Sequence, residues 1–136
     1  MVEIAGILLK LPDGRLVMQR RDGGAPTSPN MLSLFGGHIE PGELSDDAIK
    51  REVQEETSLG VASLNINYVF DCIAPNPQNP ATVGVKVYIY CADIESADFE
   101  VYEGSGAEVY KLEELLRRTD ISPASFYVLQ NMPKLK

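Results

Sequence analysis

The chain has 136 residues, of which 44% are hydrophobic and 24% are charged, as in an ordinary globular protein. This length is enough to bury a hydrophobic core, and we expect residues 1–136 to form a single domain. The formal net charge of −8 disfavours binding to nucleic-acid polymers and to anionic membranes. No run of about 18 apolar residues occurs, so the sequence predicts no membrane-spanning helix.

The cysteines and the N-terminus bear on the compartment. Cys72 and Cys91 lie in apolar, strand-like segments and form no C-x-x-C pair. Isolated cysteines of this kind favour reduced, buried thiols over a disulfide and indicate a cytoplasmic protein. Residues 1–10 carry an acid early and lack a signal-peptide cleavage site, so we expect a strand there.

The first third of the chain predicts strands joined by a tight turn and a long loop. Residues 2–10 and 15–20 are apolar runs on either side of a Pro-Asp-Gly turn signal, which predicts a hairpin. Residues 22–31 are rich in Gly, Pro, Ser and Asn and are expected to form a loop. A short strand at 32–35 then leads into two consecutive glycines.

A helix is expected from about residue 46 to residue 57. Ser45 suits its N-cap, and Asp46 and Asp47 favour its first turn because negative charge stabilises a helix N-terminus. One apolar stripe runs along this helix, and we expect the stripe to dock on the sheet. Its members are Ala48, Ile49 and Val53.

The second half of the chain predicts further strands and two helices. Residues 63–73 and 82–92 are expected to be strands, the second of them central in its sheet because it is rich in β-branched and aromatic residues. Between them, three prolines in 75–80 predict a loop. The remaining expected elements are a short strand at 109–110 and helices at 111–118 and 123–131, the last one capped by Ser122 and Pro123. Mixed strands with two or three helices predict a sheet covered on both faces.

The first expected helix places three glutamates on one face, because Glu52, Glu55 and Glu56 stand at i, i+3 and i+4. Like charges stacked in this way repel one another and destabilise an isolated helix. A cation between them removes the repulsion, and carboxylate oxygens are the ligands that Mg²⁺ and Mn²⁺ prefer. The alternative is an amphipathic helix whose acidic face is simply solvated and supported by surface pairs with Lys50 and Arg51.

The segment 37–59, GHIEPGELSDDAIKREVQEETSL, resembles a Nudix box, G-x5-E-x7-R-E-U-x-E-E-x-G-U, in which U is a bulky aliphatic residue. The matching positions are Gly37, Glu43, Arg51, Glu52, Val53, Glu55, Glu56 and Leu59. The ninth specified position, a glycine in the box, is Ser58 here. Because glycine there would suit a left-handed helix end, we expect a different exit from the helix, with Gly60 taking the turn.

The resemblance implies an α/β fold, a Nudix-type α/β/α sandwich around a mixed β-sheet that covers essentially the whole chain. It also implies a hydrolase of phosphorus-containing acid anhydrides that depends on Mg²⁺ or Mn²⁺. By motif position, Glu52 and Glu56 are the leading metal ligands, and Glu55 is a ligand or the catalytic base. The backbone carbonyl of Gly36, just before the box, is a further implied metal contact.

Two other box residues and one neighbour are expected to act less directly. Glu43 and Arg51 are expected to pair with each other and to orient the helix. His38 is the sole histidine and falls on a variable position of the box. Since a hard metal prefers oxygen, we expect its presence to be incidental.

Candidates outside the box are acids and arginines. Members of this family often contribute one further acid as a base or extra ligand, for which Glu103 is the first choice and Glu108 the second; an exposed loop glutamate is the alternative. Arg20 and Arg21 close the second expected strand, and guanidinium groups suit phosphate oxygens. By strand alternation only one of them should point into the cleft, and a solvated strand end is the other interpretation.

The substrate is weakly encoded. Four aromatic residues suit stacking on a nucleobase but equally suit the core, namely Tyr68, Phe70, Tyr88 and Phe126. Ser125 takes the place that we align with the asparagine of mutator-type members, which weakens an oxidised-dGTP substrate. Pro75 resembles a mark of ADP-ribose-type members, although a simple loop breaker is the favoured interpretation. Nucleoside triphosphates and nucleotide sugars are therefore the preferred classes, with ADP-ribose as an alternative.

Two other functions share the fold. One is a non-catalytic domain that binds a nucleotide as a sensor, against which the intact acids of the box argue. The other is an isomerase of isoprenoid diphosphates, which would need further metal-binding histidines that a chain with one histidine lacks. Homodimers are common in the family, so a homodimer is expected by analogy alone.

Overall fold

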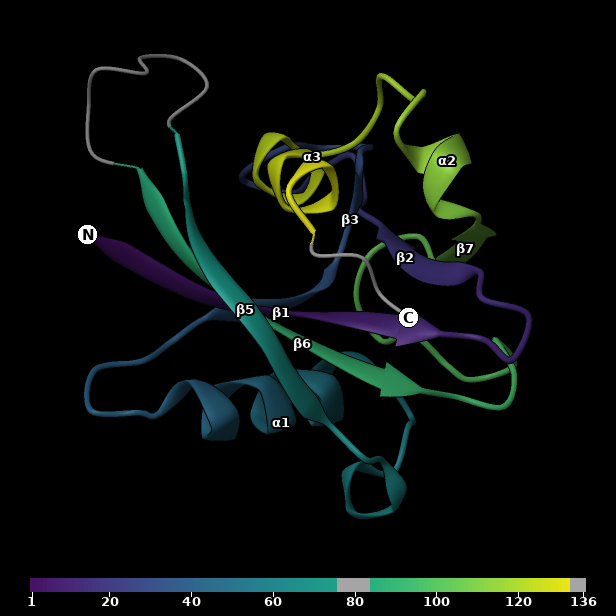
Figure 1. Cartoon of the computed structure of the whole chain (residues 1–136), viewed down its shortest axis with the longest axis horizontal. Coiled ribbons are helices and arrows are strands. Elements are labelled where there is room, and N and C mark those ends of the chain that lie inside the picture. Colours follow the sequence, from purple (N-terminus) through teal and green to yellow (C-terminus); the bar gives the residue numbers. More distant parts are fainter. Residues whose placement is uncertain (76–83, 133–136) are drawn as a thin grey trace.

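The computed structural model describes residues 1–75 and 84–132. One mixed sheet runs through the molecule, with α1 on one face and α2 and α3 on the other (Figure 1). The strands are β1 Val2–Lys10, β2 Leu16–Arg20, β3 Leu32–Ser33, β4 Phe35–His38, β5 Asn67–Ala74, β6 Val85–Asp93 and β7 Ala107–Tyr110. The helices are α1 Ser45–Glu56, α2 Leu112–Leu115 and α3 Pro123–Gln130, with a short 3₁₀ helix η1 at Val61–Ser63.

Strand β1 is the central strand of this sheet and pairs with β2, β4 and β6. It pairs in parallel with β6 along its whole length, and β6 in turn pairs antiparallel with β5. On its other side, the first half of β1 pairs with β4 and the second half with β2, both antiparallel. The predicted hairpin between β1 and β2 is confirmed, with Leu9 opposite Val17, and the predicted central position of β6 is confirmed as well.

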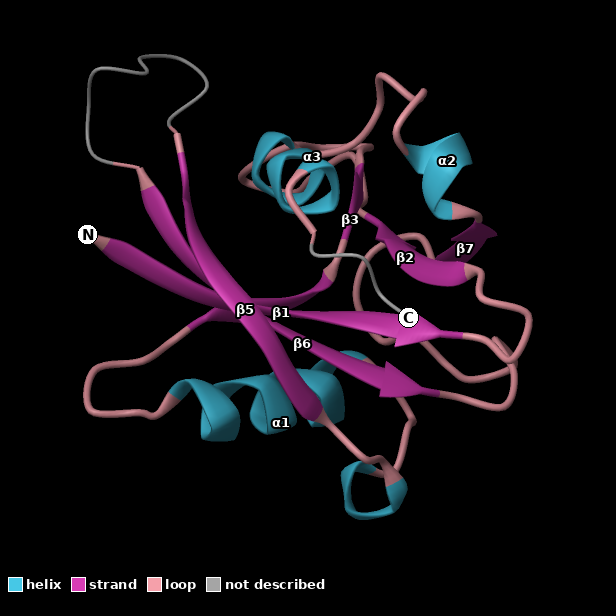
Figure 2. Cartoon of the chain, in the orientation of Figure 1, coloured by secondary structure: helices cyan, strands magenta, loops and turns pink. Residues whose placement is uncertain are grey.

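Both faces of the sheet are buried because successive residues of β1 point to opposite sides. Ile7 packs into the core under α1 together with Ile49 and Val53, whereas Leu8 packs into the core under α3 together with Val128. Figure 2 shows the strands lying between helices on either side. The predicted α/β/α sandwich is therefore confirmed, and the predicted apolar stripe of α1 does dock on the sheet.

The start of α1 differs from the prediction. Leu44 is the N-cap, and Ser45 is instead the first helical residue. The hydroxyl groups of Ser45 and Tyr90 lie 2.6 Å apart and share a hydrogen bond. The Ser45 hydroxyl therefore bonds to a tyrosine on β6 and does not cap the helix. Capping preferences consider only hydrogen bonds between a side chain and the nearby backbone. A partner that is distant in the sequence can bind the hydroxyl instead.

The end of α1 also differs. Thr57 is extended, at φ −139° and ψ 163°, and forms an isolated antiparallel bridge with Val101. Gly60 has φ −79° and so is not left-handed, but the chain does turn from this glycine into η1, where the Ser63 N–H donates to the Gly60 carbonyl at 2.9 Å. The predicted strand at 63–73 begins only at Asn67, because the chain first turns through η1.

Other boundaries shift by a few residues. The expected strand at 32–35 breaks at Leu34 into β3 and β4, and the expected helix at 111–118 shortens to α2. The expected helix at 123–131 is confirmed as α3, with Ser122 at its N-cap and proline at its first turn. Residues 76–83 lie outside the described residues, and with them most of the expected loop at 75–80 and the start of the expected strand at 82–92.

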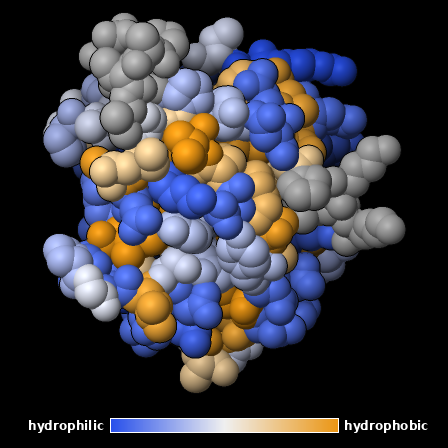
Figure 3. Space-filling view, turned by 60° about the vertical axis from the view of Figure 1, so that its left-hand side comes forward, coloured by the Kyte–Doolittle hydropathy of each residue, from blue (hydrophilic) through white to orange (hydrophobic). Residues whose placement is uncertain are grey.

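The face of the molecule seen in Figure 3 is mixed, with apolar patches lying between polar groups. Large apolar side chains that are exposed include Leu44, Tyr68 and Ile73. Cys72 and Cys91 are free thiols and are half-buried. Within residues 1–75 and 84–132, no helix is long and apolar enough to cross a membrane.

Candidate active site

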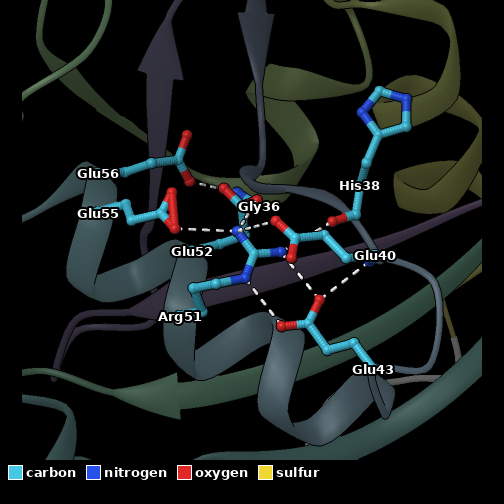
Figure 4. A network of polar contacts seen from close by, with 8 residues as sticks. All are labelled: Gly36, His38, Glu40, Glu43, Arg51, Glu52, Glu55 and Glu56. Atoms are coloured by element: carbon cyan, nitrogen blue, oxygen red, sulfur yellow. Dashed lines mark hydrogen bonds and ion pairs between the residues drawn. The ribbon is translucent and has the colours of Figure 1, made fainter.

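The last turns of α1 carry the acidic face to the strand β4 (Figure 4). Glu56 is buried, with 3% of the residue exposed, and the Glu52 side chain is 14% exposed. Glu55 is the outermost of the three, with a side chain that is 52% exposed. The i, i+3, i+4 spacing puts the three acids on one face, and the packing of this face leaves one carboxylate inside the protein, one at its edge and one in solvent.

Glu56 is a buried carboxylate without a cation. Its Oε1 atom accepts a hydrogen bond of 2.8 Å from the backbone N–H of Gly36, and none of the described lysines, arginines or histidines forms an ion pair with it. Burial raises the pKa of this carboxyl to about 8, and the nearby charges of Glu52 and Glu103 add to the rise. Glu56 is therefore either protonated or, when it is charged, stabilised by a cation from outside the chain.

Two glycines allow β4 to approach its neighbours so closely. Gly36 has φ +142°, and a Cβ atom at this position would lie 2.0 Å from the carbonyl oxygen of Ala5 on β1. A Cβ atom on Gly37 would lie 2.5 Å from Oε1 of Glu52. Glycine at both positions thus lets the strand lie against the acidic face, because there is no room for a side chain at either position.

Arg51 neutralises the outer part of the acidic face. Its guanidinium group forms two hydrogen bonds of 2.8 and 3.0 Å with Glu43 and single bonds of 3.0 Å with Glu52 and with Glu55. It also donates to the backbone carbonyl of His38, whose ring points away from the carboxylates in Figure 4. The pair with Arg51 lowers the pKa of Glu43 to about 2. Arg51 thus fixes the acids around it while leaving Glu56 unpaired.

Glu103 lies on a loop that is fastened directly to the site. The backbone N–H of Tyr102 donates to the carbonyl of Glu56 at 2.7 Å, and the Gln19 side chain donates to the carbonyl of Glu103 at 3.1 Å. Gln19 was not predicted as a site residue. The signal was present, since alternation places this polar side chain on the same face of β2 as the core residue Val17.

The structure separates Arg20, the last residue of β2, from Arg21, which follows the strand. Arg20 is turned away from the acidic face, where Glu108 binds it at 2.7 and 2.8 Å and Asp120 binds it at 3.0 Å. Glu108 thus belongs with Arg20 and not with the three glutamates. Arg21 lies on the site side and donates to the carbonyl of Thr27. Which of the two arginines contacts phosphate stays a prediction, and the geometry favours Arg21.

An open hollow of about 450 Å³ adjoins Glu103. Arg21 and the expected loop at 22–31, through Asp22 and residues 24–26, form one wall, and residues 102–104 form the other. Tyr102 is 57% exposed, and sequence reasoning missed it. The aromatic residues that were predicted to stack on a base, Tyr68, Phe70, Tyr88 and Phe126, do not line this hollow.

Ser125 has a structural partner. Its hydroxyl accepts a hydrogen bond of 3.1 Å from the backbone N–H of Leu34, at the break between β3 and β4, and the residue is buried. The position that we aligned with a base-reading asparagine therefore supports the strand break.

The donor set suits a hard divalent cation, although the cluster is not pre-assembled. Within the described part of the chain, no three His, Cys, Asp or Glu side chains already converge on one point. Glu52 and Glu56 nonetheless present carboxylates whose pKa values are raised, first of all by burial; the charge of Glu103 adds to the rise at both. Mg²⁺ commonly takes one or two carboxylates and completes its octahedral shell with water and substrate phosphates. Glu52 and Glu56 would hold such an ion.

Comparisons with known proteins identify the family of this chain. NAD-capped RNA hydrolase NUDT12 of Homo sapiens is 40% identical over 58 residues, a match that covers 43% of this chain and only 12% of that protein. The structure of DR0079 from Deinococcus radiodurans matches with a TM-score of 0.81 and 20% identity, covering 98% of this chain and 83% of that one. The NUDIX domain of Shewanella oneidensis NrtR, complexed with ADP ribose, matches with a TM-score of 0.72 and 15% identity, covering 96% and 84% of the two chains. The family model of the NUDIX domain matches residues 2–132, and the chain therefore belongs to this family.

Proposed function

We propose that this NUDIX domain is a Mg²⁺- or Mn²⁺-dependent pyrophosphohydrolase that cleaves a diphosphate linkage in a nucleoside diphosphate linked to another moiety. Glu56 is the observation that carries the proposal, because it is buried at the site, lacks a cation partner among the described residues and lies next to Glu52. A buried carboxylate is stable in its charged form only when a counter-charge is supplied. A divalent cation that arrives with a diphosphate supplies this charge.

The roles of the chain's own residues follow from their environments. Glu52 and Glu56 bind the cation, with the carbonyl of Gly36 as a further ligand, and the Gly36 N–H keeps the Glu56 carboxylate in place. Either Glu55, which reaches solvent, or Glu103, on its anchored loop, accepts the proton of the attacking water. Arg51 and Glu43 orient this machinery through their shared hydrogen bonds. When bound, the cation neutralises phosphate oxygens and acidifies a bound water.

The open hollow next to Glu103 supports a substrate with a group beyond its phosphates. Arg21 on its wall suits a phosphate oxygen, and the exposed ring of Tyr102 suits stacking on a nucleobase or sugar. Nucleoside triphosphates and nucleotide sugars remain the preferred substrates. ADP-ribose is the alternative, and the ADP ribose in the similar NrtR structure supports it.

A non-catalytic nucleotide-binding domain is the second candidate. It is favoured by one observation, namely that no three metal-ligating side chains of the described residues are already assembled. The retention of Glu52, Glu55 and Glu56 together with Arg51 argues for the hydrolase, because a binding domain needs no such set of acids.

The deciding experiment is a substrate panel. The protein is incubated with Mg²⁺ and with dNTPs, ADP-ribose, nucleotide sugars and dinucleoside polyphosphates, and the release of monophosphates is measured. We expect turnover of one class, with most activity lost in Glu55→Gln and in Glu56→Gln and retained in Glu113→Gln, an exposed acid on α2. Micromolar nucleotide binding without turnover of any substrate would establish the sensor instead. Wild-type rates in Glu56→Gln would show that the acidic face is misassigned.

A further inference from the structure

Ser58 stands where the Nudix box has glycine, and the structure gives this departure a consequence. The only non-glycine residues with positive φ in the described part of the chain are Ser28 and Asn30. The backbone of Ser58 therefore lies outside the left-handed region, and a side chain is accommodated there without strain. The residue is exposed at the end of α1, so its hydroxyl is free to make a contact that glycine cannot make.

That contact is with a segment more than forty positions away in the sequence. The Ser58 hydroxyl accepts a hydrogen bond of 2.8 Å from the backbone N–H of Glu100, and the Ser58 N–H donates to the carbonyl of Glu100 at 3.0 Å. Thr57 forms its antiparallel bridge with Val101, and the Glu56 carbonyl accepts from Tyr102. Three successive residues, 56–58, are thus joined to three successive residues, 100–102. We call this pairing the helix-exit clasp.

The clasp ends one residue before Glu103. On the far side of Glu103, the N–H of Ser105 donates to the carbonyl of Arg20 at 2.8 Å, and Gly104 packs so closely that a Cβ atom would lie 2.4 Å from the same carbonyl. Glu103 is therefore held between two anchors, the clasp on α1 and the end of β2. Since the clasp includes the backbone of Glu56, it sets the position of Glu103 relative to the buried carboxylate.

We infer that Ser58 is a positioning residue for Glu103, because its hydroxyl fastens the segment 100–102 to the end of α1 and so holds Glu103 beside Glu52 and Glu56. The inference rests on the proposed function, in which Glu103 serves as base or extra ligand. Glycine at this position would keep the backbone bond but leave the Glu100 N–H to water. Serine thus lacks the conformational freedom of glycine but adds a side-chain hydrogen bond that ties the segment 100–102 to the end of α1.

Hydrogen exchange of the cation-free protein tests the tether without reference to catalysis. In Ser58→Ala, the amides of Glu100 and Tyr102 should exchange about fivefold faster, as expected for the loss of one ordinary hydrogen bond from a local opening. Ser58→Thr keeps a hydroxyl and should restore wild-type exchange. Ser63→Ala is the matched control, because it removes another exposed hydroxyl, bonded to Gly60 in the neighbouring turn. Unchanged exchange in Ser58→Ala would overturn the inference.

A double-mutant cycle then tests whether Ser58 acts through Glu103. With the substrate identified by the panel, Ser58→Ala should lower kcat about fivefold, and Ser58→Thr should restore it. In a Glu103→Gln background the same change should have no further effect, because the group to be positioned is already absent. Equal losses in both backgrounds would overturn the positioning role. If no substrate is turned over, the proposed function fails, while the exchange experiment still decides the tether.

Discussion

The burial of Glu56 predicts that, without a divalent cation, the protein loses stability as the pH rises. Burial raises the pKa of this carboxyl to about 8, from 4.5 for an unperturbed glutamate. A group whose pKa is raised by folding holds its proton more tightly in the folded state. Its contribution to stability is therefore full below pH 4.5 and is lost as the pH rises toward 8.

The size of this effect follows from the two pKa values. Between pH 5 and pH 7.5 the unfolded carboxyl ionises while the folded one stays mostly protonated, which lowers the free energy of unfolding by about 3 kcal/mol. Glu56→Gln removes the term, because an amide does not titrate and its oxygen still accepts the Gly36 N–H. Urea unfolding at both pH values in the presence of a chelator measures the difference.

The comparison needs a control that changes the same charge without the burial. Glu55→Gln serves, since this side chain lies on the same helix and is half exposed. We expect its pH dependence to match the wild type, whereas that of Glu56→Gln is flatter by about 3 kcal/mol. Identical pH dependence in all three proteins would refute the reasoning. At pH 7.5, Mg²⁺ at a hundred times its Kd should stabilise the wild type by about 2.7 kcal/mol and Glu56→Gln by much less.

Three further predictions concern the walls of the site. Gly37→Ala should weaken Mn²⁺ binding about tenfold or more in calorimetry, because its Cβ displaces the Glu52 carboxylate, whereas Gly24→Ala, whose Cβ meets only ordinary contacts, should not. Gly36→Ala should lower the free energy of unfolding by about 3 kcal/mol or more in urea, because its Cβ would overlap the Ala5 carbonyl at a positive φ; a fully stable variant would contradict this. Arg21→Met should raise KM while Arg20→Met mainly lowers stability, and a KM effect confined to Arg20→Met would reverse the assignment.

The helix and its acidic face could be predicted because both are local patterns. The spacing of Glu52, Glu55 and Glu56 places them on one face wherever the helix docks, and the apolar stripe decides that it docks on the sheet. The observed helix begins and ends within one residue of the prediction. The pattern does not predict how deeply each glutamate is buried. The burial of Glu56 and the exposure of Glu55 depend on how closely β4 packs against α1.

Contacts between distant segments account for what was missed. Alternation predicts that only one of Arg20 and Arg21 points into the cleft, but the choice between them depends on where Glu108 and Asp120 fall, on β7 and before α3. In the same way, the Ser45 hydroxyl has Tyr90 as its partner, and Ser58 has Glu100. Each pairing spans more than forty residues, and nothing in the local sequence specifies it.

The arrangement of charge argues for a cation site at Glu56 more strongly than the number of acids does. A uniformly acidic surface would share its arginines among its carboxylates, yet Arg51 binds Glu43, Glu52 and Glu55 and does not reach the most buried acid. Glu56 instead receives one backbone N–H, which fixes its orientation without neutralising it. A buried carboxylate that is held in place but not neutralised destabilises the folded protein unless a bound cation compensates its charge. We therefore propose that the instability of the cation-free site would give a divalent ion its affinity there.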